Sequence, residues 1–367
     1  MTFKNNKYVK HVLSLIILAS CTTSSKNLQN QTFQDQVPKY ERTLEDISEY
    51  KKFFVNDLNI IEEFLKSEEL NQEDRRQIKL LKNNFKKILS HKGYVLTLNQ
   101  ENKYSQELIK LIYETNLPIK VLWGDTKESP LPNNLINYKL NGFCSSLQND
   151  ATQSILNNID NEKSSTLVVF APKYKDVVQN LISDNSLILT LQYGATNFQE
   201  FASEILEVNA SKERFDRISS LSPNQKLQFS PRTRVDLKEI VLLMEPRDYK
   251  AMIPALRYHG GKNYKYLNFI SALDGIDDPI QLLDYEDSFI PISNLALKKI
   301  SSGEMESLKG FLVESILQDW LLIQVLRQSG TKPTYVNGLT GSVYYQTNSC
   351  SKREVPLQKI TPELFSD

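Results

Sequence analysis

Residues that bind metals or act as nucleophiles are scarce in this chain of 367 residues, which has three histidines and three cysteines. None of the motifs GxSxG, HExxH, GxxxxGK[ST] or GxGxxG occurs. The usual sequence evidence for a serine hydrolase, a zinc protease or a nucleotide-binding enzyme is therefore missing. Beyond residue 20 only His91 and His259 remain, and neither has a cysteine or an acid at metal-ligand spacing. The sequence predicts no enzyme, no metal site and no cofactor.

Three features that could be taken for catalytic groups have simpler interpretations. Gly260-Gly261 follows His259 at the end of a helical pattern, so it is expected to terminate a helix. The acid pairs Asp277-Asp278 and Glu286-Asp287 could serve acid–base catalysis, but both lie in loop-like stretches. We expect them to be solvated turns.

Long apolar runs and an excess of basic charge are also absent. Three of the 44 basic residues lie in residues 1–20, which leaves 41 basic against 44 acidic residues and a net charge of −3. No basic stripe suggests a nucleic-acid partner. The most apolar helix candidate, Phe311 to Leu326, is interrupted by polar residues, so it is predicted to be a buried core helix and not a membrane span.

The N-terminus has the pattern of a secretory signal peptide. Three lysines precede an apolar core from Val12 to Ala19, which is too short to span a bilayer. The sequence Leu18-Ala19-Ser20-Cys21 resembles the lipobox of bacterial lipoproteins, which implies cleavage before Cys21 and attachment of lipid to it. The alternative is an ordinary signal peptide with a chance cysteine. By the same resemblance, Thr22 after the cysteine, in place of aspartate, favours the outer membrane.

Composition divides the chain into four parts. Residues 1–20 form the signal peptide, and residues 21–40 are polar and predicted to be a flexible, lipidated tether. Residues 41–92 show helical periodicity in two runs, the second following Asn71 as a candidate N-cap. Residues 93–367 form the main domain.

In residues 93–367 strands and helices alternate. Strands are predicted at 94–98, 118–123, 165–170, 187–192, 239–244 and 265–270, and helices at 105–116, 149–159 and 174–182. Short strands separated by amphipathic helices indicate parallel sheets covered on both faces. The predicted fold class is α/β, with two doubly wound lobes.

The second half of the chain carries several short motifs in a fixed order. Ser211-Lys212-Glu213-Arg214-Phe215 precedes Leu227 to Asp236, with Arg232, Arg234 and Asp236, and then a buried strand. Asp319-Trp320 and Gly338-Leu339-Thr340-Gly341 follow. Together with the lipobox, this combination resembles the LppC family of lipoproteins, the outer-membrane activators of class A penicillin-binding proteins, from about Tyr94 to Val355.

The resemblance implies a fold like the type I periplasmic binding proteins, with two lobes joined by crossing strands. It also implies a non-enzymatic protein on the periplasmic face of the outer membrane, which binds a class A penicillin-binding protein and activates peptidoglycan synthesis. Family members have a long helical domain before the two lobes, and they open the first lobe with an apolar strand and a Gly-rich turn. Neither has a counterpart here, so the first lobe is expected to be trimmed and preceded by a short helical segment.

Several residues of the main domain have two open interpretations. Cys144 and Cys350 could form a disulfide or remain as two buried thiols. Arg232, Arg234 and Asp236 could bind a partner's carboxylate, although a structural role in fixing a loop to the strand is favoured. For Asp319, set on an apolar helix, we expect hydrogen bonds from the end of a loop.

Trp123 closes a predicted strand, where open α/β sheets bind ligands. It could stack on a ligand, although packing in the core is the favoured interpretation.

The competing function is that of a solute-binding lipoprotein of a transporter that recognises an amino-acid-like ligand. The fold serves both functions. A solute receptor usually lines its cleft with hydroxyl groups and a charged pair. The segments expected at the cleft of the first lobe, 97–99 and 123–125, supply few such groups.

Overall fold

The computed structural model describes residues 61–62, 65, 70–124, 131–159, 165–183, 188–194, 197–221, 226–260, 263–276, 278–302 and 308–365. The chain divides into two compact units, Met1–Asp46 and Ile47–Asp367, and every described residue belongs to the second. The predicted signal peptide, the tether with Cys21 and nearly all of the first predicted helix lie outside the described residues. Among the helices that are described, none is long and apolar enough to cross a bilayer.

Helix α5 (Gln72–Ser90) is the second of the two helices predicted in residues 41–92. Its N-cap is Asn71, as predicted: the side-chain oxygen accepts a hydrogen bond from the backbone N–H of Asp74 at 2.9 Å. The acids in the first turn lie where the helix dipole favours negative charge. The buried face carries Ile78, Leu81, Phe85 and Ile88.

The next three elements form a small parallel unit. Strands β1 (Tyr94–Asn99) and β2 (Ile119–Gly124) pair in parallel and are connected by α6 (Ser105–Glu114). The other edge of β1 is met by a side chain, because the amide of Gln328 both accepts from the N–H of Val95 (2.8 Å) and donates to its carbonyl (2.9 Å). In the described ranges this sheet has two strands.

A six-stranded sheet forms the centre of the remaining structure. Its strands are β3 (Ser165–Phe170), β4 (Ile188–Gln192), β5 (Leu237–Leu243), β6 (Lys265–Asn268), β7 (Ser288–Pro291) and β11 (Leu357–Lys359). The order is β11-β7-β6-β5-β3-β4, and all neighbours are parallel except β11 with β7. From β3 the chain adds β4 on one side and then β5, β6 and β7 on the other. This is a doubly wound order whose direction changes between β3 and β5.

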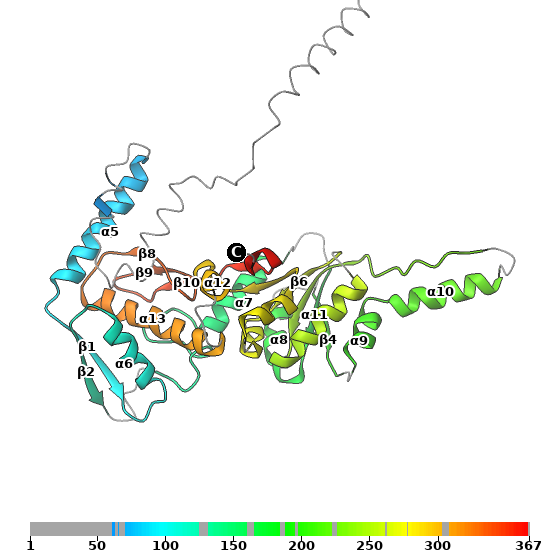
Figure 1. Cartoon of the computed structure of the whole chain (residues 1–367), viewed down its shortest axis with the longest axis horizontal. Coiled ribbons are helices and arrows are strands. Elements are labelled where there is room, and N and C mark those ends of the chain that lie inside the picture. Colours follow the sequence, from blue (N-terminus) through cyan, green and yellow to red (C-terminus); the bar gives the residue numbers. More distant parts are fainter. Residues whose placement is uncertain are drawn as a thin grey trace, which may run out of the picture. The chain divides into compact units, whose positions relative to one another are not determined.

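Helical elements precede and connect these strands. They are α7 (Leu147–Asn157), the 3-10 turn η2 (Pro172–Tyr174), α8 (Lys175–Ser183), α9 (Phe198–Ile205), α10 (Val208–Leu221), α11 (Pro246–Gly260), and the 3-10 turns η3 (Ile270–Gly275) and η4 (Pro279–Tyr285). Right-handed crossovers place α8 on one face of the sheet and α9 with α11 on the other. In agreement, α11 packs against α9, η3 and η4 (Figure 1).

The last part of the chain adds helices and a small antiparallel sheet. It contains α12 (Asn294–Ser301), α13 (Leu308–Gln328), β8 (Thr334–Asn337), β9 (Ser342–Tyr345), β10 (Lys352–Glu354) and the 3-10 turn η5 (Pro362–Phe365). The order of the small sheet is β10-β9-β8. The prediction of a buried core helix over Phe311 to Leu326 is confirmed, since Trp320, Leu321 and Leu326 are almost completely buried.

The structure therefore confirms the α/β class with a mostly parallel sheet. Within the described residues, three segments connect the elements around β1, β2 and α13 with the six-stranded sheet. The first crossing segment (131–146) precedes α7, the second (291–302) follows β7, and the third (346–356) contains β10 and precedes β11. The side chains of these segments determine how the parts of the domain are held together.

Candidate functional site

The first and third crossing segments are joined by a disulfide between Cys144 and Cys350, whose Cα atoms are 4.8 Å apart. Of the two states that the sequence left open, the structure has the bonded one. The backbones also pair here: the N–H of Cys144 donates to the carbonyl of Ser351 (2.9 Å), and the N–H of Ser351 donates to the carbonyl of Gly142 (2.7 Å). The two segments are thus held both covalently and by hydrogen bonds.

A buried arginine lies beside the disulfide. The Arg353 side chain is 3% exposed, and its guanidinium carbon is 4.1 Å from the ring centroid of Phe143. Its Nε is 3.6 Å from a carboxylate oxygen of Asp150 on α7. Burial lowers the pKa of Arg353, while the charges of Asp150 and Asp319 raise it. Burial also disfavours the charged form of Asp150, and it raises the pKa of that carboxyl group. This pair could not be predicted from local patterns, because Asp150 and Arg353 are far apart in the chain.

Asp319 caps the turn between β8 and β9. Its carboxylate is almost completely buried and accepts hydrogen bonds from the N–H of Leu339 (3.0 Å), the N–H of Thr340 (2.8 Å) and the hydroxyl of Thr340 (2.6 Å). The expected hydrogen bonds from a loop end are therefore present. Burial raises the pKa of Asp319, and its hydrogen bonds and Arg353 act in the opposite direction. Both oxygens are used inside the fold.

Two glycines make this turn possible. A Cβ on Gly338 would lie 2.7 Å from the Asp319 oxygens, and one on Gly341 would lie 2.3 Å from the carbonyl oxygen of Glu354. Gly341 also has a φ of +145°, which a residue with a side chain rarely adopts. The Gly-Leu-Thr-Gly motif is thus explained by the close approach of the backbone to Asp319 and β10.

We predict that Gly341→Ala lowers the free energy of unfolding by about 2–3 kcal/mol, because the new Cβ meets backbone in an unfavourable conformation. Gly194→Ala is the matched control, since no atom in the described part of the chain lies within 4 Å of the Cβ it would add. Urea unfolding followed by tryptophan fluorescence measures both. Equal midpoints for the two variants would contradict this explanation of the motif.

The Arg232, Arg234 and Asp236 group lies immediately before β5. The guanidinium of Arg234 donates two hydrogen bonds to the Asp236 carboxylate (3.0 and 2.5 Å) and lies 3.8 Å from Glu207. The bonds from Arg234 hold the pKa of Asp236 below its ordinary value. Tyr264 donates its hydroxyl to the carbonyl of Arg234 at 2.6 Å. Arg234 and Asp236 thus fix the entry to the strand, as the favoured interpretation expected.

Arg232 is different. Its backbone N–H donates to the hydroxyl of Ser211 on α10 at 3.1 Å, whereas its side chain is exposed. Its guanidinium forms no ion pair within the described ranges. Of the three residues, only Arg232 has a charge that is available to a partner.

The favoured interpretation of Trp123 is wrong. Trp123 is 51% exposed at the end of β2, and its neighbour Leu122 is 42% exposed. Trp123 does not pack in the core because β2 is the outer strand of a two-stranded sheet. Neither face of β2 is therefore fully covered. The indole is accessible at the carboxyl end of a parallel strand.

A polar cluster that was not predicted from the sequence lies at the carboxyl ends of β3, β4 and β5. Lys173 forms an ion pair with Glu245 and lies 4.8 Å above the ring of Tyr174. Burial, with a smaller contribution from the charge of Glu245, raises the pKa of Asp248, and burial raises the pKa of Tyr193. The strand order changes direction here, which is where doubly wound folds bind ligands. The feature of the sequence that could have revealed this cluster is the polar residue that follows each apolar strand.

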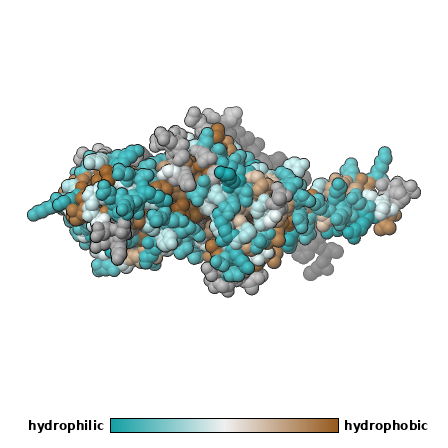
Figure 2. All heavy atoms as spheres, turned by 90° about the horizontal axis from the view of Figure 1, so that it is seen from below, coloured by the Kyte–Doolittle hydropathy of each residue, from teal (hydrophilic) through white to brown (hydrophobic). Residues whose placement is uncertain are grey.

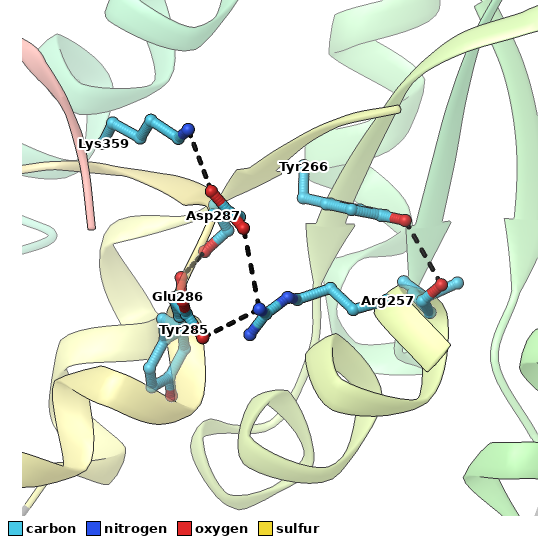
Figure 3. A network of polar contacts seen from close by, with 8 residues as sticks. Arg257, Tyr266, Tyr285, Glu286, Asp287 and Lys359 are labelled. Carbon is cyan, nitrogen blue, oxygen red and sulfur yellow. Dashed lines mark hydrogen bonds and ion pairs between the residues drawn. The ribbon is translucent and has the colours of Figure 1, made fainter. Parts of the chain in front are cut away.

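The expectation that Glu286-Asp287 is a solvated turn is also wrong. Arg257 on α11 lies 2.8 Å from Glu286 and 3.6 Å from Asp287, and Asp287 also pairs with Lys359 on β11 at 2.9 Å (Figure 3). The side chain of Asp287 is only 15% exposed. This network is structural, because it joins α11 and β11 at the start of β7. Asp277 of the other acid pair lies outside the described residues, while Asp278 caps η4.

Within the described residues, no group of three or more histidines, cysteines and acids is arranged to hold a metal ion. His91 stacks on Tyr94 at the end of α5, and His259 lies in the last turn of α11, which ends at Gly260. The helix reaches Gly260, while Gly261, the second residue of the predicted helix end, lies outside the described residues.

A small cavity lies among the crossing segments. It has a volume of about 20 Å³ and mostly apolar walls, with Leu147, Ile292 and Leu339 among its lining residues. Such a volume holds one water molecule. This cavity is too small for an amino acid.

No protein-family model matches this chain, and a search of the curated proteins finds no significant match.

Proposed function

We propose that this protein is a lipid-anchored envelope protein that binds a class A penicillin-binding protein and stimulates its synthesis of peptidoglycan. In this proposal Cys21 carries the lipid, Thr22 directs the protein to the outer membrane, and the main domain works on the periplasmic face. The protein acts by contact and catalyses no reaction. The lipobox and the order of the motifs from Ser211 to Gly341 support the proposal.

The proposed fold is that of a two-lobed type I periplasmic binding protein with a trimmed first lobe. Two observations support this finer assignment. The parallel strands of the six-stranded sheet have the doubly wound order of one lobe, and three crossing segments connect it to the rest. The parallel pair β1 and β2 would be what remains of the sheet in the first lobe.

The observation that carries the functional proposal is the linkage between the crossing segments. The disulfide joins the first segment to the third, and Arg353 of the third pairs with Asp150. The second is tied to the third by the N–H of Ile292, which donates to the carbonyl of Pro356 at 3.0 Å. Solute receptors close by changing the dihedral angles of such segments. Segments tied in this way favour a fixed surface, which suits a protein that binds another protein.

A solute-binding lipoprotein is the second candidate, and one observation favours it. Lys173, Tyr193 and Glu245 lie at the carboxyl ends of the strands, where a doubly wound sheet binds small ligands. Charged and aromatic groups of this kind could recognise an amino-acid-like ligand.

One experiment separates the two functions. The full-length chain is crosslinked in cells and probed for class A penicillin-binding proteins, and the purified chain is heated with a panel of amino acids and short peptides. Our proposal predicts capture of the synthase and a melting temperature unchanged by any ligand. Failure to capture the synthase, together with a rise in melting temperature that saturates with one small ligand, would assign the protein to solute binding.

A further inference from the structure

Helix α10 and the returning segment 226–236 form an arm that extends from the main domain beyond α9 (Figure 1). The base of this arm is firmly held. The N–H of Arg234 donates to the carbonyl of Leu206 at 3.1 Å, and the hydroxyl of Ser211 accepts from the N–H of Arg232. Further out, the rings of Phe215 and Phe229 contact each other with centroids 5.0 Å apart.

The outer half of α10 has one face that no other described element covers, although Arg217 on it forms an ion pair with Glu213 of the same helix at 3.3 Å. Arg214, Arg217, Ile218 and Leu221 follow the spacing i, i+3, i+4, i+7 and therefore share one side of the helix. All four are exposed, Ile218 by 56% and Leu221 by 83%. Figure 2 shows hydrophobic side chains beside hydrophilic ones at the outer end of the arm. We call these four residues the arm stripe.

Exposure of this face is unfavourable for an isolated element. A helix of 14 residues is marginally stable in water without packing, and Ser211 is the one residue of α10 that is buried. Anchors at i, i+3, i+4 and i+7 are the pattern by which a helix docks into an apolar groove of another protein. The arm stripe has this pattern, with arginine at two of the four positions.

The net positive charge of the arm indicates which charge its binding groove on a partner should carry. Apart from the ion pairs at its base and the Arg217–Glu213 pair, basic residues outnumber acidic ones in the described part of the arm: Lys212, Arg214, Lys226 and Arg232 against Asp216. The mature chain, in contrast, has a small negative net charge. A partner surface with carboxylates around an apolar groove complements this arm.

We propose that the arm is the docking element of this protein and that the arm stripe of α10 inserts into an apolar, carboxylate-rimmed groove on its protein partner. This inference rests on the proposed function, because it assigns the contact surface for the synthase. A lipid surface fits less well. Helices that lie on membranes carry a broad apolar face and a basic polar face, whereas here arginines share the apolar side, Glu213 pairs with Arg217 at its border, and Asp216 lies on the opposite side.

The test measures binding of the full-length chain to a purified class A penicillin-binding protein in detergent, by biolayer interferometry. Arg214→Glu/Leu221→Glu removes one basic and one apolar residue of the arm stripe. The matched control is Lys110→Glu/Tyr113→Glu on α6, which changes an exposed lysine and a tyrosine that is 84% exposed. We expect affinity to fall about 100-fold for the arm variant and by no more than about twofold for the control. Thermal melting should show that both variants remain folded.

The outcomes are distinct. Wild-type affinity in the folded arm variant would overturn this inference and leave the proposed function standing. Absence of binding by the wild-type chain would overturn the proposed function and, with it, the partner assigned to the arm. The same proteins are mixed with vesicles of phosphatidylglycerol and phosphatidylethanolamine. If the arm variant lost vesicle binding while keeping its affinity for the synthase, the arm would contact lipid and the inference would be wrong.

Discussion

Replacing Cys144 and Cys350 together by serine should lower the free energy of unfolding by about 4 kcal/mol. The disulfide joins residues separated by 206 positions, so it restricts a very large loop in the unfolded chain. In the folded chain the two segments keep their backbone hydrogen bonds, and we therefore expect the variant to fold. Urea unfolding monitored by far-ultraviolet circular dichroism measures the change.

Two controls separate the disulfide from the substitutions themselves. The wild-type chain unfolded in dithiothreitol should match the double variant, and Cys21→Ser should leave the unfolding midpoint unchanged, because Cys21 is not part of the bond. A double variant as stable as the oxidised wild-type chain would show that the crossing segments are held without the covalent link. That result would weaken the argument for a fixed domain.

Asp319→Ala should lower the free energy of unfolding by about 3–4 kcal/mol. The substitution leaves the N–H groups of Leu339 and Thr340 without their buried acceptor. It also removes a negative charge whose field reaches Arg353, which is itself almost completely buried. Trp320, the next residue on α13, makes intrinsic fluorescence a suitable probe of this unfolding.

Asp319→Asn should cost less than Asp319→Ala, since the amide oxygen retains one acceptor at nearly the same position. Asp216→Ala on the exposed part of α10 is the control and should leave the midpoint unchanged. If Asp319→Ala unfolded with the same midpoint as the Asp216 control, the carboxylate would not hold the turn, and the role assigned to it would be wrong.

The sequence predicted the strands of the first two thirds of the main domain well, whereas α9 and α10 were not predicted. Ser165–Phe170 is a strand with the predicted bounds, and β1, β2, β4 and α6 lie within two residues of the predictions. These elements have clear periodicity and are separated by turn residues, so local patterns are sufficient. The N-cap at Asn71 was found for the same reason, because capping depends on neighbouring residues.

The short strands near the C-terminus were not predicted. Strands β7 to β11 contain three or four residues each, which is too short to show a periodic pattern. They exist because of pairing with distant segments, as where β11 adds to β7 in the antiparallel direction. Propensity alone does not reveal such pairing.

Among the polar residues, interactions between neighbours in the sequence were predicted and interactions between distant segments were not. Arg234 and Asp236 are two residues apart, and their ion pair was expected. The partners of Arg353 come from α7 and α13, so the sequence offered no sign of its burial. Trp123 was misplaced because its exposure depends on β2 being an outer strand, which is a property of the whole sheet.

The central claim is that this protein acts on a cell-wall synthase by contact. The most direct measurement is the rate at which a purified class A penicillin-binding protein polymerises fluorescent lipid II, with and without an equimolar amount of the full-length chain. Our account predicts a faster rate with the wild-type chain and no increase with Arg214→Glu/Leu221→Glu. An unchanged rate at concentrations that saturate binding would contradict it.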